Sequence, residues 1–117
     1  EMDLEAIALS NHGGRQLDGA PAPFELLESV AQAVGGEIEI ICDGGVRRGS
    51  DIAKAISLGA DACMAGRAYL YGLGAAGERG VDFVLEHLKE GLVRTMALTG
   101  AASLEDLSGD LVRIRDR

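Results

Sequence analysis

The sequence has no long apolar run. None of its apolar stretches approaches the roughly 20 residues that a membrane-spanning helix requires. The first residues also carry no pattern of a secretory signal peptide. We therefore expect a cytoplasmic protein, with peripheral contact to a membrane as the alternative for a longer protein.

Cysteine is scarce and basic residues form no stripe. Cys42 and Cys63 stand in or at the end of apolar runs, without CxxC spacing or a histidine partner. We expect buried, reduced thiols and no metal site. The net charge of −8, with the 11 Lys and Arg dispersed, argues against nucleic-acid binding.

Apolar runs and helical spacing alternate along the 117 residues, of which 47% are hydrophobic. Strands are predicted over residues 5–10, 38–42 and 62–65. One helix is predicted from Pro23, and a second is predicted with Ser50 as its N-cap. A glycine-rich connection over 72–80 is expected before a long helix that Gly100 ends, followed by a short helix capped by Ser103.

This order of strands and helices indicates an α/β fold. Strand starts are separated by roughly 33 and then 23 residues, which suits right-handed crossovers between parallel strands. Three such units form either part of an open sheet or a sector of an eight-fold barrel, and periodicity does not separate these two. The chain starts almost directly with a strand, so we expect it to begin inside a larger fold.

The segment from Ser10 to Asp18 follows the first strand, where α/β folds keep their chemistry. His12 can accept a proton near neutral pH. Arg15 can bind a carboxylate through two parallel hydrogen bonds. A turn histidine and a surface arginine are the structural alternatives.

Glycines also follow the second and third strands, as Gly44-Gly45 and Gly66-Arg67. Backbone N–H groups, a helix N-terminus and arginines at the ends of adjacent strands fit a phosphate. Arg67 and either Arg47 or Arg48 are the expected cations, and a tight turn with solvated arginines is the alternative. The pattern differs from the dinucleotide motif GxGxxG, which favours a mononucleotide phosphate.

Other polar and aromatic residues are given structural roles. His87 is expected on the surface of the long helix, beside charged neighbours. Tyr69 and Tyr71 are expected to pack beneath the phosphate loop, and Asp18 and Asp61 to be structural.

Three segments together resemble the FMN-dependent 2-hydroxy acid oxidases and dehydrogenases, a family that includes glycolate oxidase, L-lactate dehydrogenase and mandelate dehydrogenase. They are Leu9–Asp18 (LSNHGGRQLD), Ile41–Asp51 (ICDGGVRRGSD) and Ala65–Arg67 (AGR), and the later segment TMALTG also matches. The resemblance implies a TIM barrel of which residues 1–117 form the C-terminal three βα units, as part of a single FMN-binding domain.

The resemblance also implies roles for individual residues. His12 matches the family's catalytic base, Arg15 its carboxylate clamp and Ser10 a residue near the flavin ring. The matches to the FMN ribityl and phosphate site are Asp43, Gly44, Gly45, Val46, Arg47, Gly66 and Arg67. The family's flavin-side lysine, substrate tyrosines and catalytic aspartate have no counterpart in this chain.

The expected activity is FMN-dependent oxidation of an L-2-hydroxy acid, lactate-like in the first instance, to the 2-keto acid. Oxygen or a quinone-like compound would accept the electrons. The alternatives are a family relative acting on a substrate other than a hydroxy acid, and an inactive FMN- or phosphate-binding fragment. Exposed strand edges lead us to expect either association with the rest of the barrel or a homo-oligomer, and an isolated chain without activity.

Overall fold

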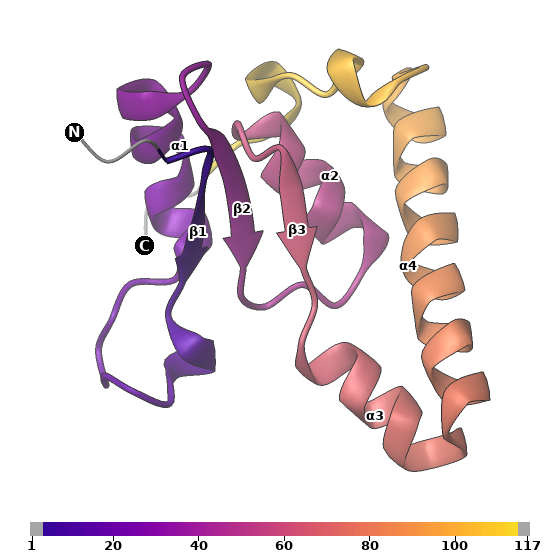
Figure 1. Cartoon of the computed structure of the whole chain (residues 1–117). Helices are drawn as coiled ribbons and strands as arrows, with labels where there is room; N and C mark the ends of the chain where they lie inside the picture. Colours follow the sequence, from indigo (N-terminus) through magenta and orange to yellow (C-terminus); the bar gives the residue numbers. More distant parts are fainter. Residues whose placement is uncertain (1–3, 115–117) are drawn as a thin grey trace.

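Three parallel strands form the centre of the structure, a computed structural model that describes residues 4–114 (Figure 1). They are β1 (Ala6–Ser10), β2 (Glu39–Asp43) and β3 (Ala62–Met64), in the order β1-β2-β3. Both strand pairs are parallel, as predicted, and Asp43 is aligned with Ser10 on one side and Met64 on the other. The loops that carry the predicted site residues therefore leave the sheet at the same end.

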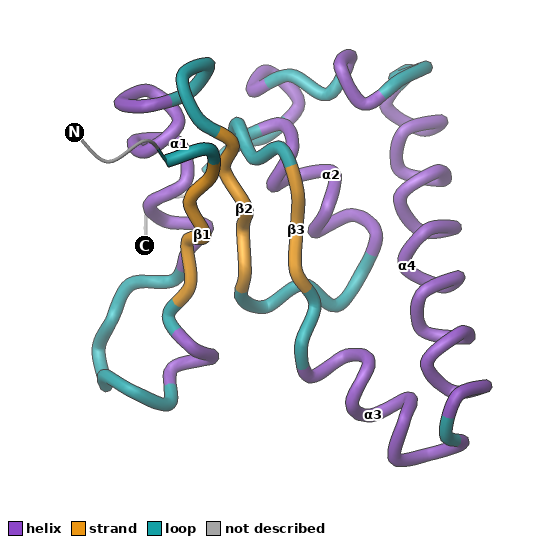
Figure 2. The backbone as a smooth tube through the Cα atoms, viewed as in Figure 1, coloured by secondary structure: helices purple, strands orange, loops and turns teal. Residues whose placement is uncertain are grey.

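Four helices connect and follow the strands (Figure 2). They are α1 (Pro23–Val34) and α2 (Gly49–Ser57) between strands, then α3 (Arg67–Ala76) and α4 (Glu78–Thr99). Three short 3-10 helices complete the described chain: η1 (His12–Gly14), η2 (Leu104–Asp106) and η3 (Gly109–Leu111). Gly100 ends α4 and Ser103 is the cap residue of η2, as predicted from the sequence.

The core lies between the sheet and α1 and α2, which both lie behind the strands in Figure 1. Leu27 of α1 and Ala55 of α2 are fully buried against Ile40 and Cys42 of β2. The other face of the sheet carries Ala8, Ala62 and Met64, which are exposed. The sheet is thus packed on one face only within residues 4–114.

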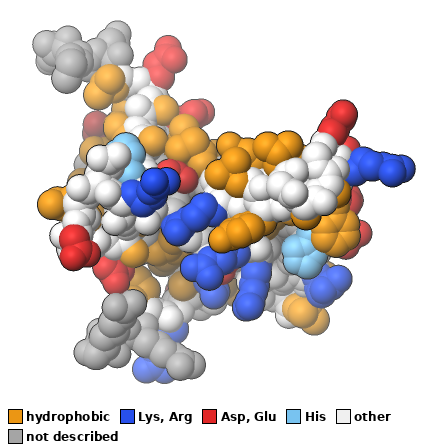
Figure 3. Space-filling view, turned by 90° about the horizontal axis from the view of Figure 1, so that it is seen from below, with side chains coloured by type: hydrophobic (Ala, Val, Ile, Leu, Met, Phe, Trp, Pro, Cys, Tyr) orange, Lys and Arg blue, Asp and Glu red, His pale blue; other side chains and the backbone are white. Residues whose placement is uncertain are grey.

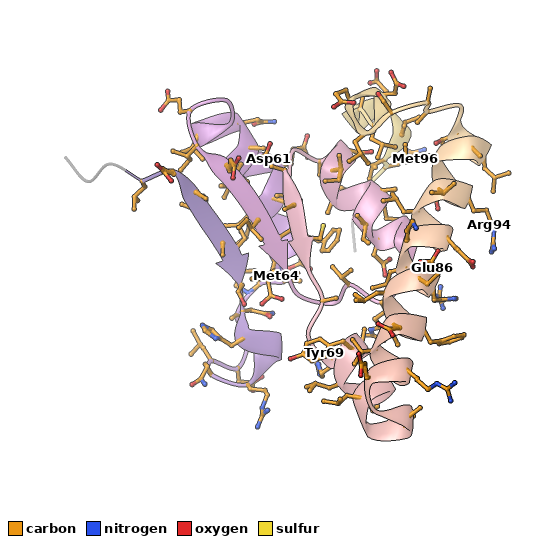
Figure 4. All side chains as sticks on the ribbon, turned by 45° about the vertical axis from the view of Figure 1, so that its right-hand side comes forward. Asp61, Met64, Tyr69, Glu86, Arg94 and Met96 are labelled. Carbon is orange, nitrogen blue, oxygen red and sulfur yellow. The ribbon has the colours of Figure 1, made fainter. Side chains whose placement is uncertain are left out.

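A second apolar cluster joins α4 to α2. Ala53 of α2 packs with Ala101 and Leu107, and Met96 of α4 lies against them. Met96 points toward this cluster whereas Arg94 points away from it (Figure 4). This packing fixes α4 beside α2, so that its first turns lie near the carboxyl ends of the strands.

The predicted connection over 72–80 is wrong, because most of it is helical. Helix α3 continues to Ala76, and only Gly77, with a φ of +61°, separates it from α4. Gly72 and Gly80 lie where the two helices touch, and a Cβ on either would clash with the backbone of the other. Here glycine permits close packing of helices rather than a loop.

The predicted cap at Ser50 is also wrong. Helix α2 begins at Gly49, with Arg48 as the N-cap residue. The carboxylate of Asp51 accepts hydrogen bonds from the backbone N–H groups of Arg47 (3.1 Å) and Arg48 (3.0 Å). These donors precede the helix, so the Asp51 carboxylate holds the chain entering α2 and does not replace the predicted cap.

Two expectations concern the whole chain. The predicted domain spans residues 1–117, of which 1–3 and 115–117 lie outside the described residues. None of the helices within residues 4–114 combines the length and apolarity that crossing a membrane demands.

Both cysteines are free, and Cys42 is buried as expected, whereas Cys63 is only half-buried.

Candidate functional site

A hollow of about 630 Å³ lies at the carboxyl ends of the strands, the end seen in Figure 3. The loops after all three strands line it, together with the first turns of α3 and the N-terminal part of α4. The lining residues are His12, Gly13, Arg15, Asp43, Gly44, Gly45, Val46, Arg47, Met64, Gly66, Arg67, Ala68, Tyr71, Phe83, Val84 and His87.

The charge of the lining is opposite to that of the chain. Three arginines, Arg15, Arg47 and Arg67, line the hollow with a single carboxylate, Asp43, although the net charge of the chain is −8. Basic side chains gather at the middle of this face in Figure 3. The Asp43 carboxylate accepts a 2.7 Å hydrogen bond from the Ser10 hydroxyl. The hollow is therefore suited to an anion.

The loop after β1 is held in a tight conformation by its own polar groups. The His12 N–H donates to Ser10 Oγ (3.1 Å), and the Gly13 N–H donates to Asn11 Oδ1 (3.1 Å). The Gly14 N–H donates to the Asn11 carbonyl (2.9 Å). His12 itself has a φ of +54°, an uncommon value for a residue with a Cβ. Such a backbone persists where its surroundings enforce it, as at functional sites.

One helix begins at the hollow with an open N-terminus. Helix α3 begins after Gly66, has no side-chain cap and has no acidic residue in its first turn. The free backbone N–H groups of a helix N-terminus attract anions. Arg67, the first residue of α3, adds a full positive charge at the same place.

The loops after β1 and β3 meet across the sheet. The guanidinium of Arg67 lies over Gly13, with Nη2 3.1 Å from the position that a Cβ on Gly13 would take. The hollow is therefore continuous from the His12 side to the Arg67 side.

The structure brings most of the predicted site residues together. His12, Arg15, Gly66, Arg67 and every residue from Asp43 to Arg47 line the hollow. Ser10 lies at its edge and reaches it through Asp43.

The helical side of the hollow differs from the sequence-based expectation. Tyr71 is 77% exposed and lines the hollow, and Tyr69, labelled in Figure 4, is also exposed, so neither packs beneath the phosphate loop as predicted. His87 is exposed, as expected, but it also lines the hollow. Its ring is stacked on that of Phe83, with 6.3 Å between the ring centroids. Phe83 was not predicted, because it reaches the hollow only through the packing of α4 near the strand ends.

A family model described as FMN-dependent dehydrogenase matches residues 1–114. Among curated relatives, "Putative L-lactate dehydrogenase" of Mycobacterium tuberculosis is 54% identical over 108 residues, which is 92% of this chain and 26% of the relative. "Pre-mycofactocin synthase" of the same species is 51% identical over 108 residues, which is 92% of this chain and 27% of the relative. Human 2-Hydroxyacid oxidase 1 is 47% identical over 110 residues, covering 94% and 30%.

Solved structures agree with this assignment. A crystal structure of (S)-Mandelate Dehydrogenase matches with a TM-score of 0.86 and 50% identity, over 91% of this chain and 30% of that chain. A mandelate oxidase structure matches with a TM-score of 0.85 and 45% identity, covering 88% and 32%. The chain thus spans between a quarter and a third of the length of these relatives. It belongs to the FMN-dependent 2-hydroxy acid oxidase and dehydrogenase family.

Proposed function

We propose that the complete protein oxidises an L-2-hydroxy acid, lactate-like in the first instance, to the 2-keto acid with FMN as its cofactor. The observation that carries this proposal is the shared hollow, which is lined by His12 and Arg15 after β1 and by the open N-terminus of α3 with Arg67 after β3. The first pair suits a hydroxy acid, and the second suits a phosphate.

The residues present fit the phosphate end of FMN. Arg47 and Arg67 line the hollow and would supply cations, and Gly66 is the N-cap residue of α3, which has no side-chain cap. Gly44 and Gly45 also line the hollow, with φ values of +142° and +76°. A Cβ on Gly44 would lie 3.1 Å from Pro23, so a larger residue is disfavoured at this strand end. We assign Asp43, Gly44, Gly45, Val46, Arg47, Gly66 and Arg67 to the ribityl and phosphate portions of FMN.

Two residues of the loop after β1 would bind and deprotonate the substrate. Arg15 would bind the substrate carboxylate through its fork of N–H donors. His12 would accept a proton from the substrate at a ring nitrogen. Bound FMN supplies the two-electron acceptor, and oxygen or a quinone-like compound would reoxidise it. Ser10, close to the flavin in this assignment, holds Asp43 and the His12 backbone in place.

The open face of the sheet supports a larger assembly. Ala8, Ala62 and Met64 expose an apolar surface that a closed barrel would bury. We assign the chain to the C-terminal three βα units of a (β/α)8 barrel, as part of one FMN-binding domain. The rest of the barrel, or a second copy of the chain, would cover this face and the strand edges.

The direct test measures the product. The complete protein, reconstituted with FMN, is incubated separately with L-lactate, glycolate and L-mandelate, and the 2-keto acid formed is quantified. Formation of keto acid from at least one of them is expected, whereas flavin binding without any keto acid contradicts the proposal.

A second candidate is a family enzyme that acts on a substrate other than a hydroxy acid. The 51% identity to a pre-mycofactocin synthase favours it. Protein that binds FMN, oxidises none of the three acids, and reduces its flavin with a peptide-derived carboxylate or an amine would support this candidate. Phosphate binding without any substrate-dependent reduction would indicate an inactive fragment.

A further inference from the structure

The contact between Arg67 and Gly13 joins two loops that are distant in sequence. Gly13 belongs to η1 after β1, beside His12, whereas Arg67 begins α3 after β3. The guanidinium atoms Nη2, Cζ and Nε of Arg67 lie 3.1, 3.5 and 3.8 Å from the position of a Cβ built on Gly13. The guanidinium therefore lies directly over a residue that has no side chain.

We infer that Gly13 is a positioning residue for Arg67. The absence of a Cβ at residue 13 allows the guanidinium to pack on the loop of His12 and Arg15. Any other side chain would push the guanidinium away by a few tenths of an ångström, because a Cβ at 3.1 Å is tighter than most such contacts in proteins. This inference rests on the proposed function, in which Arg67 binds the FMN phosphate and His12 is the base.

The contact between Arg67 and Gly13 connects the proposed phosphate site to the loop of His12. The His12 loop is held by local hydrogen bonds within residues 10–14, by the Ser10 hydroxyl on the Asp43 carboxylate and by the Asn11 amide on the Pro21 carbonyl. The Arg67 side chain would add a contact from the segment that follows β3, the other edge strand of the sheet. We expect occupation of the phosphate site and the placement of His12 to depend on the same pair of residues.

Gly14 offers a matched control. Its φ of +74° is close to the +68° of Gly13, so alanine is strained to a similar degree at both positions. No atom lies within 4 Å of a Cβ built on Gly14. A difference between Gly13→Ala and Gly14→Ala therefore reports the contact with Arg67 and not the backbone strain.

The test uses the complete protein, with the two alanine variants and the unchanged protein compared by FMN fluorescence titration and steady-state kinetics. Because the guanidinium must shift by a few tenths of an ångström and a hydrogen bond to a charged group is worth about tenfold or more in affinity, we expect Gly13→Ala to raise the FMN Kd by up to about tenfold. We expect Gly14→Ala to raise the Kd less than about threefold, while both variants lose similar amounts of Tm. Equal Kd values for the two variants would overturn the inference.

A second variant keeps the inference testable if Gly13→Ala does not fold. In Arg67→Lys, the planar guanidinium that covers Gly13 is replaced by a compact ammonium group, which keeps the charge but covers less of the loop. With FMN at saturating concentration, we expect kcat to fall while the KM for the hydroxy acid changes little, because the His12 loop has lost its contact. An unchanged kcat at full flavin occupancy would contradict the inference. Absence of FMN binding and turnover in the unchanged protein would instead count against the proposed function.

Discussion

Ser10 and Asp43, on neighbouring strands, are joined by a hydrogen bond of 2.7 Å from the Ser10 hydroxyl to Asp43 Oδ2. Ser10 Oγ also accepts the backbone N–H of His12 at 3.1 Å. The backbone at His12 is thereby linked to the loop that begins at Asp43. The Ser10 hydroxyl thus connects the loop of His12 to the loop that begins at Asp43.

His12→Gln should abolish turnover while the flavin stays bound. Glutamine retains hydrogen-bonding capacity but does not accept a proton near neutral pH, so kcat should fall by roughly 10²- to 10⁴-fold. FMN Kd should change less than about threefold, since the substitution leaves Arg67 and the N-terminus of α3, the proposed phosphate-binding groups, unchanged. Steady-state kinetics and flavin fluorescence titration measure the two effects. Turnover near that of the unchanged protein would exclude His12 as the base.

Arg15→Lys and Arg67→Lys form a complementary pair. Both keep a positive charge and lose the guanidinium fork. We expect Arg15→Lys to raise KM and reduce kcat/KM by about 10- to 100-fold with little change in FMN Kd, because a bidentate carboxylate contact is lost. Arg67→Lys should weaken FMN binding instead. If Arg15→Lys lost FMN as strongly as substrate, the carboxylate clamp would be assigned to the wrong arginine.

Leu27→Ala should destabilise the fold far more than Leu26→Ala. Leu27 is 0% exposed in the core between α1 and the sheet, and Leu26 is 41% exposed. We expect Leu27→Ala to cost about 2–5 kcal/mol in the free energy of unfolding, because it leaves a cavity. Leu26→Ala should cost less than about 1 kcal/mol. Urea titrations of the complete protein compare the two, and equal losses would contradict the described core.

The two thiols should make stability depend on pH in the alkaline range. Burial, with a smaller contribution from the charge of Asp43, raises the pKa of Cys42 from 9.0 to about 11. Burial, with a contribution from Cys42, raises the pKa of Cys63 to about 12. The unfolded chain therefore releases its thiol protons first, so these groups favour unfolding as the pH rises above about 9 and until it passes the folded pKa values.

The measurement follows the unfolding midpoint in urea between pH 8 and 11. We expect it to fall with pH in the unchanged protein and to fall less steeply in Cys63→Ala. Iodoacetamide at pH 8 should modify the native thiols much more slowly than the thiols in urea, because the thiolate is the reactive form. Equally fast modification in both conditions would show that the two thiols are not shielded.

The sequence predicts the strand ends well because each apolar run stops directly before glycine or a polar residue. Ser10, Asp43 and Gly66 mark these ends, and the structure brings their loops together as expected for parallel strands. The order of parallel strands required only the rule that consecutive βα units pair side by side. His12 and Arg15 could be selected locally because the residues around them form a compact motif.

The remaining features depend on contacts that local patterns do not contain. Ser50 has the side chain of a good N-cap, but α2 begins one residue earlier, at Gly49, and Asp51 binds the backbone N–H groups of Arg47 and Arg48. Gly72 and Gly80 are residues typical of loops, but here they lie where α3 and α4 pack against each other. His87 lines the hollow only because α4 runs back past the strand ends.

Anaerobic reduction of the bound flavin tests the central claim most directly. The complete protein is loaded with FMN, oxygen is removed, and the flavin absorbance near its visible maximum is followed after addition of L-lactate, glycolate or L-mandelate. We predict that at least one acid bleaches the flavin fully in the unchanged protein and that His12→Gln loses this bleaching with its flavin still bound. A flavin that stays oxidised with all three acids would contradict the assignment of this site to 2-hydroxy acid oxidation.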